Sequence, residues 1–115
     1  MDDRYALFPH LRFAQPAPGL LEIVLDAPNL NAVGPEAHAE LADVWLVVDR
    51  DHDTKVALLT GAGRGFSAGG SFDLIDGVTN DFAMRTRVLR EARDLVIAHR
   101  DPCEPRDVAD LFVRH

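Results

Sequence analysis

Glycine is concentrated in one short stretch of this chain. Five of its eight glycines lie within the ten residues from Gly61 to Gly70. The stretch directly follows Lys55 to Thr60, a short apolar run of the kind found in strands buried on both faces. Glycine serves where a ligand must approach the main chain closely or where the backbone turns tightly. A buried strand that runs straight into such a loop is therefore the first place to look for a functional site.

The segments before this strand predict a hairpin and a helix. Residues 11–16 and 20–26 are predicted strands, because apolar side chains of the second recur at every other residue. An Ala-Pro-Gly turn between them predicts antiparallel pairing. Pro35 suits the first position of a helix over residues 35–49, whose apolar residues trace one face. Strand, helix and strand together predict an α/β fold with a parallel pair and a right-handed crossover.

The segments around and beyond the glycines are less regular. Residues 26–32 are predicted as a loop, because a proline and two asparagines oppose regular structure. A short helical turn is predicted over Phe72 to Asp76, and a helix over residues 81–97 with Asn80 or Asp81 as its cap. The predicted apolar face of that helix consists of Phe82, Val88, Leu89, Ala92, Leu95 and Val96. Its arginines, Arg85, Arg87, Arg90 and Arg93, are interpreted as solvated surface, with an anion-binding patch as the alternative.

The composition excludes several classes of function. The 115 residues carry 12 Lys plus Arg against 19 Asp plus Glu, a net charge of −7 that does not suit sequence-independent nucleic-acid binding. One cysteine, Cys103, excludes an internal disulfide and a multi-thiolate metal site and is interpreted as a bystander thiol. The histidines lack metal-ligand spacing. No signal peptide and no apolar run of about 18 residues is visible, so a cytoplasmic domain without a membrane partner is expected.

Two local motifs within the glycine-rich stretch have alternative meanings. Residues 63–68 fit the dinucleotide fingerprint G-x-G-x-x-A, but that motif must open directly into a long helix and only a short turn is predicted. Residues 65–69, G-F-S-A-G, fit the nucleophile elbow of serine hydrolases, with Ser67 as nucleophile and His99 or His115 as its base. In that fold the serine follows the strand closely, whereas here several loop residues intervene.

A third interpretation uses the whole stretch. Residues 60–70, T-G-A-G-R-G-F-S-A-G-G, resemble the pattern T-G-x-G-x-x-F-[SC]-A-G-[AG]-D of the enoyl-CoA hydratase/isomerase (crotonase) superfamily. Residues 29–33, N-L-N-A-V, are similar to the L-N-A loop of that family and lie roughly 35 residues earlier. The elements between the motifs follow in family order. The resemblance covers about residues 11–96 and implies the N-terminal half of a crotonase-like (ClpP/crotonase) ββα spiral fold.

The resemblance also implies a site for an acyl-CoA or enoyl-CoA thioester. In the family a backbone N–H stabilises the negative charge of the enolate oxygen, and the matching residue here is Gly70. The residues placed around the substrate are Asn29, Leu30, Ala32, Ala68, Gly69, Ser71 and Phe72. The implied reaction is hydration of a 2-enoyl-CoA, a lyase reaction of fatty acid metabolism, or a related isomerisation. Coenzyme A belongs to the substrate, so no separate cofactor and no metal is expected.

The chain departs from the family pattern in several places. Ser71 stands where the family usually has Asp, and no basic residue lies between Gly19 and Glu40 to meet a CoA phosphate. After Val96 no K-P-x-[IV]-x-A-x-x-G segment follows, and with it the second oxyanion donor and the acid–base carboxylates are missing. The remaining candidates, Glu91 and Glu104, match no catalytic position of the family and receive no role.

These departures lead to expectations about the chain as a whole. Residues 1–96 are expected to form the N-terminal half of a crotonase-like domain, and residues 97–115 a divergent tail. The hypothesis for the tail is a frameshift or premature stop near codon 97. The chain alone is expected to show little or no hydratase activity, because it lacks the acid–base groups. The family assembles as trimers or hexamers through later helices that this chain lacks. A non-catalytic binding module and the serine hydrolase remain the alternatives.

Overall fold

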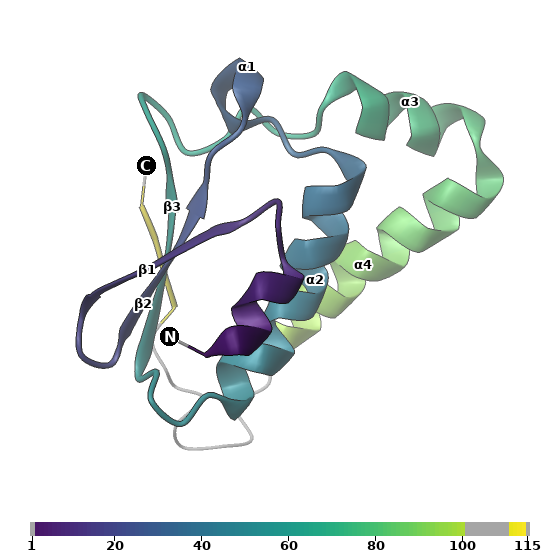
Figure 1. The fold of residues 1–115 in the computed structure, drawn as a ribbon. Helices are drawn as coiled ribbons and strands as arrows, with labels where there is room; N and C mark the ends of the chain where they lie inside the picture. Colours follow the sequence, from purple (N-terminus) through teal and green to yellow (C-terminus); the bar gives the residue numbers. More distant parts are fainter. Residues whose placement is uncertain (1, 101–110, 115) are drawn as a thin grey trace.

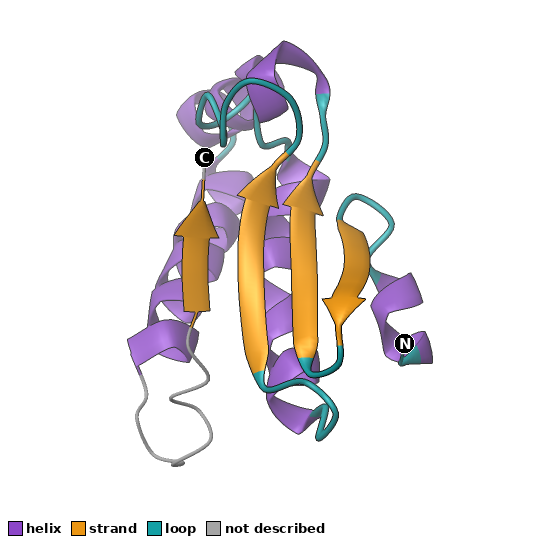
Figure 2. Ribbon diagram, turned by 90° about the vertical axis from the view of Figure 1, so that its left-hand side faces the viewer, coloured by secondary structure: helices purple, strands orange, loops and turns teal. Residues whose placement is uncertain are grey.

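The chain folds into a four-stranded sheet with helices on one face. The computed structural model describes residues 2–100 and 111–114. The elements follow in the order η1 (Asp3–Leu7), β1 (Arg12–Ala17), β2 (Leu20–Leu25), α1 (Pro28–Asn31), α2 (Pro35–Arg50), β3 (Val56–Gly61), α3 (Phe72–Asn80), α4 (Phe82–Arg100) and β4 (Leu111–Arg114). Figure 1 shows this order in colour along the chain, and Figure 2 shows the helices behind the strands.

The sheet has the strand order β1-β2-β3-β4. Strand β1 runs antiparallel to β2, whereas β2 and β3, and β3 and β4, are parallel. The predicted hairpin and the predicted parallel pair are both confirmed. Leu25 of β2 lies beside Gly61 of β3, so the two parallel strands end at the same edge of the sheet. The loops that follow them therefore start side by side.

The core lies between β2 and α2. Leu21 and Ile23 of β2 and Val44 of α2 are fully buried, as the alternation of the strand and the apolar face of the helix predict. Each such side chain contributes about 1.5–3 kcal/mol relative to an exposed one. Helix α2 begins at Pro35 as predicted and continues to Arg50. This pair of elements is the base from which the loops at the carboxyl edge extend.

A buried carboxylate closes the opposite end of α2. Asp51 is 5% exposed, and its Oδ2 accepts hydrogen bonds from the Tyr5 hydroxyl at 2.7 Å and the Thr54 hydroxyl at 2.8 Å. The backbone N–H of Asp53 donates to its Oδ1 at 3.1 Å. Burial alone raises the pKa of Asp51, but these hydrogen bonds favour the carboxylate more strongly and hold the pKa below its ordinary value. The carboxylate thus ties η1 to the connection between α2 and β3.

Two predicted segments have different shapes in the structure. Residues 26–32 are not a loop throughout, because they contain the single turn α1. Helix α3 extends to Asn80, although the prediction ended it at Asp76. Ser71 caps its start, the hydroxyl accepting from the Leu74 N–H at 3.2 Å, and in the added turn the Asn80 side chain donates to Asp76 Oδ1 at 2.8 Å.

The α3–α4 hairpin is held by caps on both helices. Asp81, one of the two predicted caps, accepts from the Met84 N–H at 3.1 Å at the start of α4. Arg85 is exposed, as predicted, and also donates to carbonyls in the last turn of α3, those of Val78 at 2.7 Å and Thr79 at 2.9 Å. No described helix is both long and apolar enough to cross a membrane.

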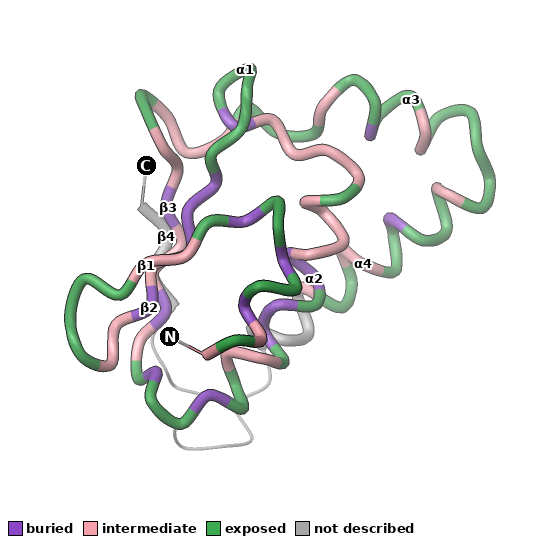
Figure 3. The backbone as a smooth tube through the Cα atoms, viewed as in Figure 1, coloured by how far each residue is buried: buried purple, intermediate pink, exposed green. Residues whose placement is uncertain are grey.

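The predicted apolar face of α4 is wrong over its first half. Val88 is buried, but Phe82 is 78% exposed and Leu89 is 60% exposed. Helix α3 and the start of α4 project away from the sheet in Figure 1, and Figure 3 marks most residues there as exposed. His38, near the start of α2, pairs with Glu91 at 2.8 Å, so the turns of α4 that precede Glu91 extend past the start of α2. Helical spacing of apolar residues predicts a face, but here no described element covers it.

The Asp51 network predicts a pH-dependent stability. Because the folded pKa of Asp51 lies below its unfolded value of about 3.9, the carboxylate stabilises the fold above that pH, and the stabilisation is lost as the pH falls through the folded pKa. Urea unfolding at pH 7 should show Asp51→Asn less stable than the native chain by about 1–3 kcal/mol. That gap should narrow below about pH 4. Asp53→Asn, an exposed neighbour, is the control; a gap that stays constant with pH contradicts the account.

Candidate functional site

The site is formed by two loops that leave the same edge of the sheet. One contains α1 and follows β2; the other comprises residues 62–71 and follows β3. The Ala62 N–H donates to the Leu25 carbonyl at 2.8 Å, so the loops are in contact from their first residues. In Figure 1 both lie above the carboxyl ends of β2 and β3. The parallel pairing of these strands therefore brings together the two motifs that the sequence separates.

The α1 turn has a left-handed backbone. Asn29, Leu30 and Asn31 have φ values of 58°, 57° and 57°. A left-handed residue other than glycine costs roughly 1–2 kcal/mol, and asparagine tolerates this conformation better than leucine does. The Leu30 side chain is 55% exposed, so its own burial does not offset the strain. Contacts from outside the turn must hold it.

The side chain of Asn31 supplies those contacts. Asn31 is 3% exposed, and its Oδ1 accepts from the Ala27 N–H at 2.9 Å. Its Nδ2 donates to the carbonyls of Ala62 at 2.8 Å, Gly65 at 3.1 Å and Phe66 at 3.2 Å. One buried amide therefore joins the α1 turn to the glycine-rich loop. Asn31 was not among the predicted site residues; the signal for it was an asparagine, tolerant of positive φ, inside the N-L-N-A motif.

The close approach of the two loops explains the glycine at the end of β3. A Cβ atom on Gly61 would lie 2.3 Å from the Phe66 carbonyl oxygen and 2.5 Å from that of Gly65. Both carbonyls also accept from Asn31. The glycine-rich loop thus folds back over its own strand, and only a residue without a side chain fits there.

Three of four consecutive amides in the second loop donate hydrogen bonds. They are Ala68 to the Leu30 carbonyl at 2.8 Å, Gly69 to the Ser67 hydroxyl at 3.1 Å, and Ser71 to the Val33 carbonyl at 2.8 Å. The fourth, the Gly70 N–H, has no hydrogen-bond partner among the residues that the structure describes. Gly70 is exposed. It is therefore a free main-chain donor held between bonded neighbours.

Gly70 lies between the first loop, to which it is bridged at Val33, and the apolar side of α3. Val33 and Gly70 form an isolated parallel bridge, in which the Val33 N–H donates to the Gly69 carbonyl at 2.7 Å. A Cβ atom on Gly70 would lie 3.1 Å from Leu74 Cδ2 and 3.6 Å from Ile75 Cγ1. The apolar side of α3 therefore lies directly against Gly70.

The structure places most of the predicted site residues together. Asn29, Leu30 and Ala32 lie on the first loop, and Ala68, Gly69, Gly70 and Ser71 on the second. Phe72 begins α3 and is 90% exposed. The Ser71 side chain is already engaged, because its hydroxyl caps α3.

The alternative interpretations fit the geometry less well. The Ser67 hydroxyl donates to the Asn31 carbonyl at 2.8 Å and accepts from Gly69, and α3 does not begin until Phe72, so Ser67 is not on a strand-to-helix elbow. The proposed bases, His99 and His115, lie outside the residues whose side chains are described, as do Cys103 and Glu104. The dinucleotide motif also ends before α3 begins.

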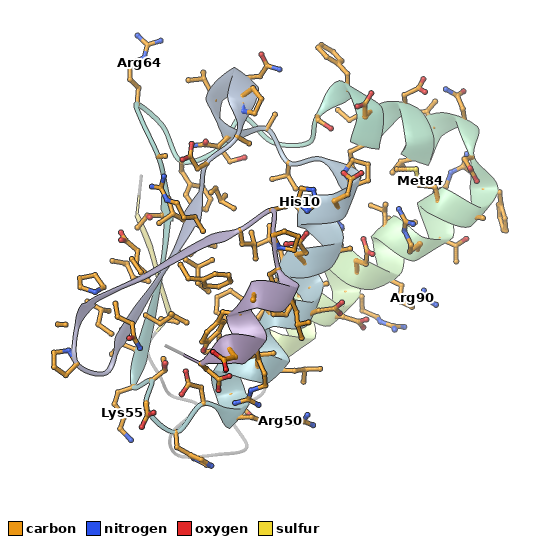
Figure 4. All side chains as sticks on the ribbon, in the orientation of Figure 1. His10, Arg50, Lys55, Arg64, Met84 and Arg90 are labelled. Carbon is orange, nitrogen blue, oxygen red and sulfur yellow. The ribbon has the colours of Figure 1, made fainter. Side chains whose placement is uncertain are left out.

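The carboxylate of Glu91 is used away from the two loops. Glu91 pairs with His38 between α2 and α4 and with Arg87 at 3.8 Å. Among the side chains that the structure describes, those of residues 2–95, no group of three or more His, Cys, Asp or Glu is placed to hold a metal ion. The donor that the two loops leave unused is the Gly70 N–H, and the side chain of Arg64, labelled in Figure 4, extends outward from the second loop.

Comparisons with known proteins agree on one family. A sequence model described as enoyl-CoA hydratase/isomerase matches residues 16–97. The 1,2-epoxyphenylacetyl-CoA isomerase of Escherichia coli is 46% identical over 52 residues, which are 44% of this chain and 20% of the isomerase. The carnitinyl-CoA dehydratase of Citrobacter koseri is 37% identical over 60 residues, 52% of this chain and 23% of the dehydratase.

A solved structure is similar over most of the described chain. The crystal structure of an enoyl-CoA hydratase/isomerase from Mycobacterium paratuberculosis superposes with a TM-score of 0.73 at 32% identity, covering 78% of this chain and 36% of that one. The chain therefore spans about a fifth of the length of the two curated relatives and about a third of the solved one.

The fold-back of the second loop predicts different costs for two glycines. Gly61→Ala places a Cβ against two carbonyl oxygens and should lower the free energy of unfolding by about 1–3 kcal/mol. Gly65→Ala, where no atom lies within 4 Å of the added Cβ, should change it by less than about 0.5 kcal/mol. Urea unfolding of both variants measures the difference. Equal costs at the two positions contradict the described loop geometry.

Proposed function

This chain belongs to the enoyl-CoA hydratase/isomerase family, and we propose that it binds an acyl-CoA thioester whose carbonyl oxygen accepts a hydrogen bond from the Gly70 N–H. Its fold is the N-terminal part of the crotonase-like α/β fold. The observation that carries the proposal is the Gly70 amide, the one donor of the four from residue 68 to residue 71 that no described residue uses. A donor held in place before the ligand arrives is what an oxyanion hole requires.

The chemistry of a thioester explains why one such donor matters. When a proton leaves the carbon next to the thioester carbonyl, negative charge develops on the carbonyl oxygen. A fixed N–H dipole stabilises that charge without any reorganisation at the moment of reaction. The Gly69 and Ser71 amides on either side are already bonded, so the loop keeps its shape while Gly70 donates.

We assign the CoA part of the ligand to the meeting point of the loops. Asn29, Leu30 and Ala32 on the first loop, with Ala68 and Gly69 on the second, form this part of the site. The support is the contact between the loops there, since the Ala68 N–H donates to the Leu30 carbonyl at 2.8 Å. The Leu30 side chain is exposed at this point and offers apolar surface to a bound group.

The two ends of the ligand are assigned from the side chains around the loops. We assign the acyl group to the apolar surface of α3, because Phe72 is 90% exposed, Ile75 is 55% exposed and the helix packs against Gly70. The CoA phosphates are assigned to Arg64, an exposed cation on the second loop (Figure 4), which takes the place of the basic residue absent near the first loop. Ser71 enters the proposal through its backbone alone.

For the complete fold we propose the class of reactions that proceed through a thioester enolate, hydration or isomerisation of an enoyl-CoA among them. The names of the two curated relatives, an epoxyphenylacetyl-CoA isomerase and a carnitinyl-CoA dehydratase, give CoA thioesters as substrates and two different reactions. For the chain alone we propose acyl-CoA binding with little catalysis. Losing one oxyanion donor costs about 10²–10³ in rate, and losing general acid–base groups costs typically about 10²–10⁴ more.

The binding proposal predicts that the Gly70 N–H contributes to affinity. Isothermal titration with crotonyl-CoA should show weaker binding to Gly70→Pro than to Gly70→Ala, by roughly three- to tenfold, the net value of one hydrogen bond. The alanine variant is the control, because it keeps the N–H and adds only a Cβ. Circular dichroism establishes that both variants fold. Equal affinity of the two variants, or no binding by the native chain at millimolar ligand, contradicts the proposal.

The catalytic proposal predicts a very low rate of hydration by the chain alone. The purified chain should hydrate crotonyl-CoA at least about 10⁴-fold more slowly than a full-length relative, since the proposal gives it one oxyanion donor and assigns no described carboxylate an acid–base role. Loss of the enoyl absorbance measures the rate. A rate typical of the full-length enzymes would show that this chain carries acid–base groups that the structure does not assign.

A further inference from the structure

We infer that Asn31 is a positioning residue for the Gly70 N–H and that it acts through the Ser67 hydroxyl and through Val33. The inference rests on the proposed function, because it concerns the donor that the thioester carbonyl would meet. Neither the sequence motifs nor the comparisons give Asn31 this role. It follows from the order in which hydrogen bonds connect the two loops.

The direction of the Gly70 N–H is determined by the peptide group to which it belongs. That group also contains the Gly69 carbonyl, and a peptide group is planar and trans. The N–H and the C=O of a trans peptide point in opposite directions. Because the Gly69 carbonyl accepts from the Val33 N–H at 2.7 Å, the Gly70 N–H points away from Val33 and out of the loop pair.

A second hydrogen bond holds the preceding peptide group. The Gly69 N–H donates to the Ser67 hydroxyl at 3.1 Å, and Gly69 has a φ of 98°, a conformation that glycine adopts freely. A free glycine between two unbonded peptide groups would let the next N–H swing. Here both peptide groups that flank Gly69 are bonded, so rotation about Gly69 is prevented from both sides.

Both anchors lead back to Asn31. The Ser67 hydroxyl donates to the backbone carbonyl of Asn31 at 2.8 Å, which orients the oxygen that accepts from Gly69. Val33 lies two residues after Asn31, in the segment that leaves the left-handed turn. The side chain of Asn31 holds that turn in place through the Ala27 N–H and the carbonyls of the second loop.

The requirements at this position explain why the residue is asparagine. The backbone needs a positive φ, the Ala27 N–H needs an acceptor, and the carbonyls of the second loop need donors. Aspartate offers the acceptor but no donors, and it would set a negative charge against the carbonyl oxygens. Glycine suits the backbone but offers neither group. Asparagine meets all three requirements from one buried side chain.

A merely structural role for Asn31 makes a different prediction. If the residue only joined the loops, its replacement would lower stability and leave the direction of the Gly70 N–H unchanged. If it positions the donor, replacement changes that direction even where the fold persists. A measurement of the N–H direction therefore separates the two roles.

The experiment uses the full chain labelled with ¹⁵N and three variants. Asn31→Gly keeps the positive φ and removes the amide; Ser67→Ala removes the link to Gly69; Ser67→Thr keeps the hydroxyl and is the matched control. Residual dipolar couplings in a weakly aligning medium report the direction of each N–H. The coupling of Gly70 should change in Asn31→Gly and Ser67→Ala and return to the native value in Ser67→Thr, while couplings in β2 and β3 stay unchanged.

A second readout follows the ligand. The stretching frequency of a ¹³C-labelled thioester carbonyl in butyryl-CoA should fall on binding to the native chain and to Ser67→Thr. In Ser67→Ala it should return toward the value of the free ligand, while the dissociation constant changes by less than about tenfold, because a single neutral hydrogen bond contributes no more than that. If Ser67 only stabilised the loop, its replacement would not be expected to change the carbonyl frequency while leaving the dissociation constant nearly unchanged.

Two results would overturn the inference. One is an unchanged Gly70 coupling in Asn31→Gly together with a lower melting temperature, which assigns Asn31 to stability alone. The other is a changed coupling in Ser67→Ala that is also changed in Ser67→Thr. If Asn31→Gly does not fold, Asn31→Asp, which keeps the acceptor for the Ala27 N–H and removes the donors to the second loop, takes its place with the same two outcomes. If butyryl-CoA does not bind the native chain, the proposed function is wrong, whereas the couplings of the free chain still decide the role of Asn31.

Discussion

The buried amide of Asn31 is the contact on which the rest of the site depends. It joins a strained left-handed turn after β2 to a glycine-rich loop after β3, and the partners of its Nδ2 lie 31 to 35 residues further along the chain. Without it, the turn and the second loop would be joined only by the backbone hydrogen bonds between them and by the Ser67 hydroxyl. With it, a series of bonded amides surrounds one free donor, the Gly70 N–H, at the carboxyl edge of the parallel strands.

The two ends of the sheet differ in how their polar groups are hydrogen-bonded. At one end the carboxylate of Asp51 closes the N-terminal segment over the core, and the result is stability. At the other end the loops leave the exposed Gly70 N–H without a partner among the described residues, and this donor is the proposed contact with a ligand. Between them β2 and α2 are buried on each other. The α3–α4 hairpin is less covered, and the exposed Phe72 next to Gly70 is where the proposed acyl group meets the protein.

Sequence rules predicted the elements whose signals are local. The hairpin follows from alternating apolar residues and a Pro-Gly turn, α2 from the helical spacing of its apolar residues, and β3 from its short apolar run. The structure contains all three. The handedness of α1 was not predictable in this way, because positive φ at Asn29 to Asn31 is stabilised by contacts distant in sequence. The face of α4 was wrong at Phe82 because periodicity does not say whether a partner exists. Gly70 came from the family resemblance, whereas Asn31 emerged from the hydrogen bonds alone.

The central claim is that the Gly70 N–H is free in the unliganded chain and donates to a thioester carbonyl. The most direct measurement is a titration of the ¹⁵N-labelled chain with butyryl-CoA followed by amide proton shifts. The account predicts that the Gly70 proton moves downfield, and by more than those of Ala68, Gly69 and Ser71, which keep their internal partners. A Gly70 proton that stays in place while the ligand binds would contradict it.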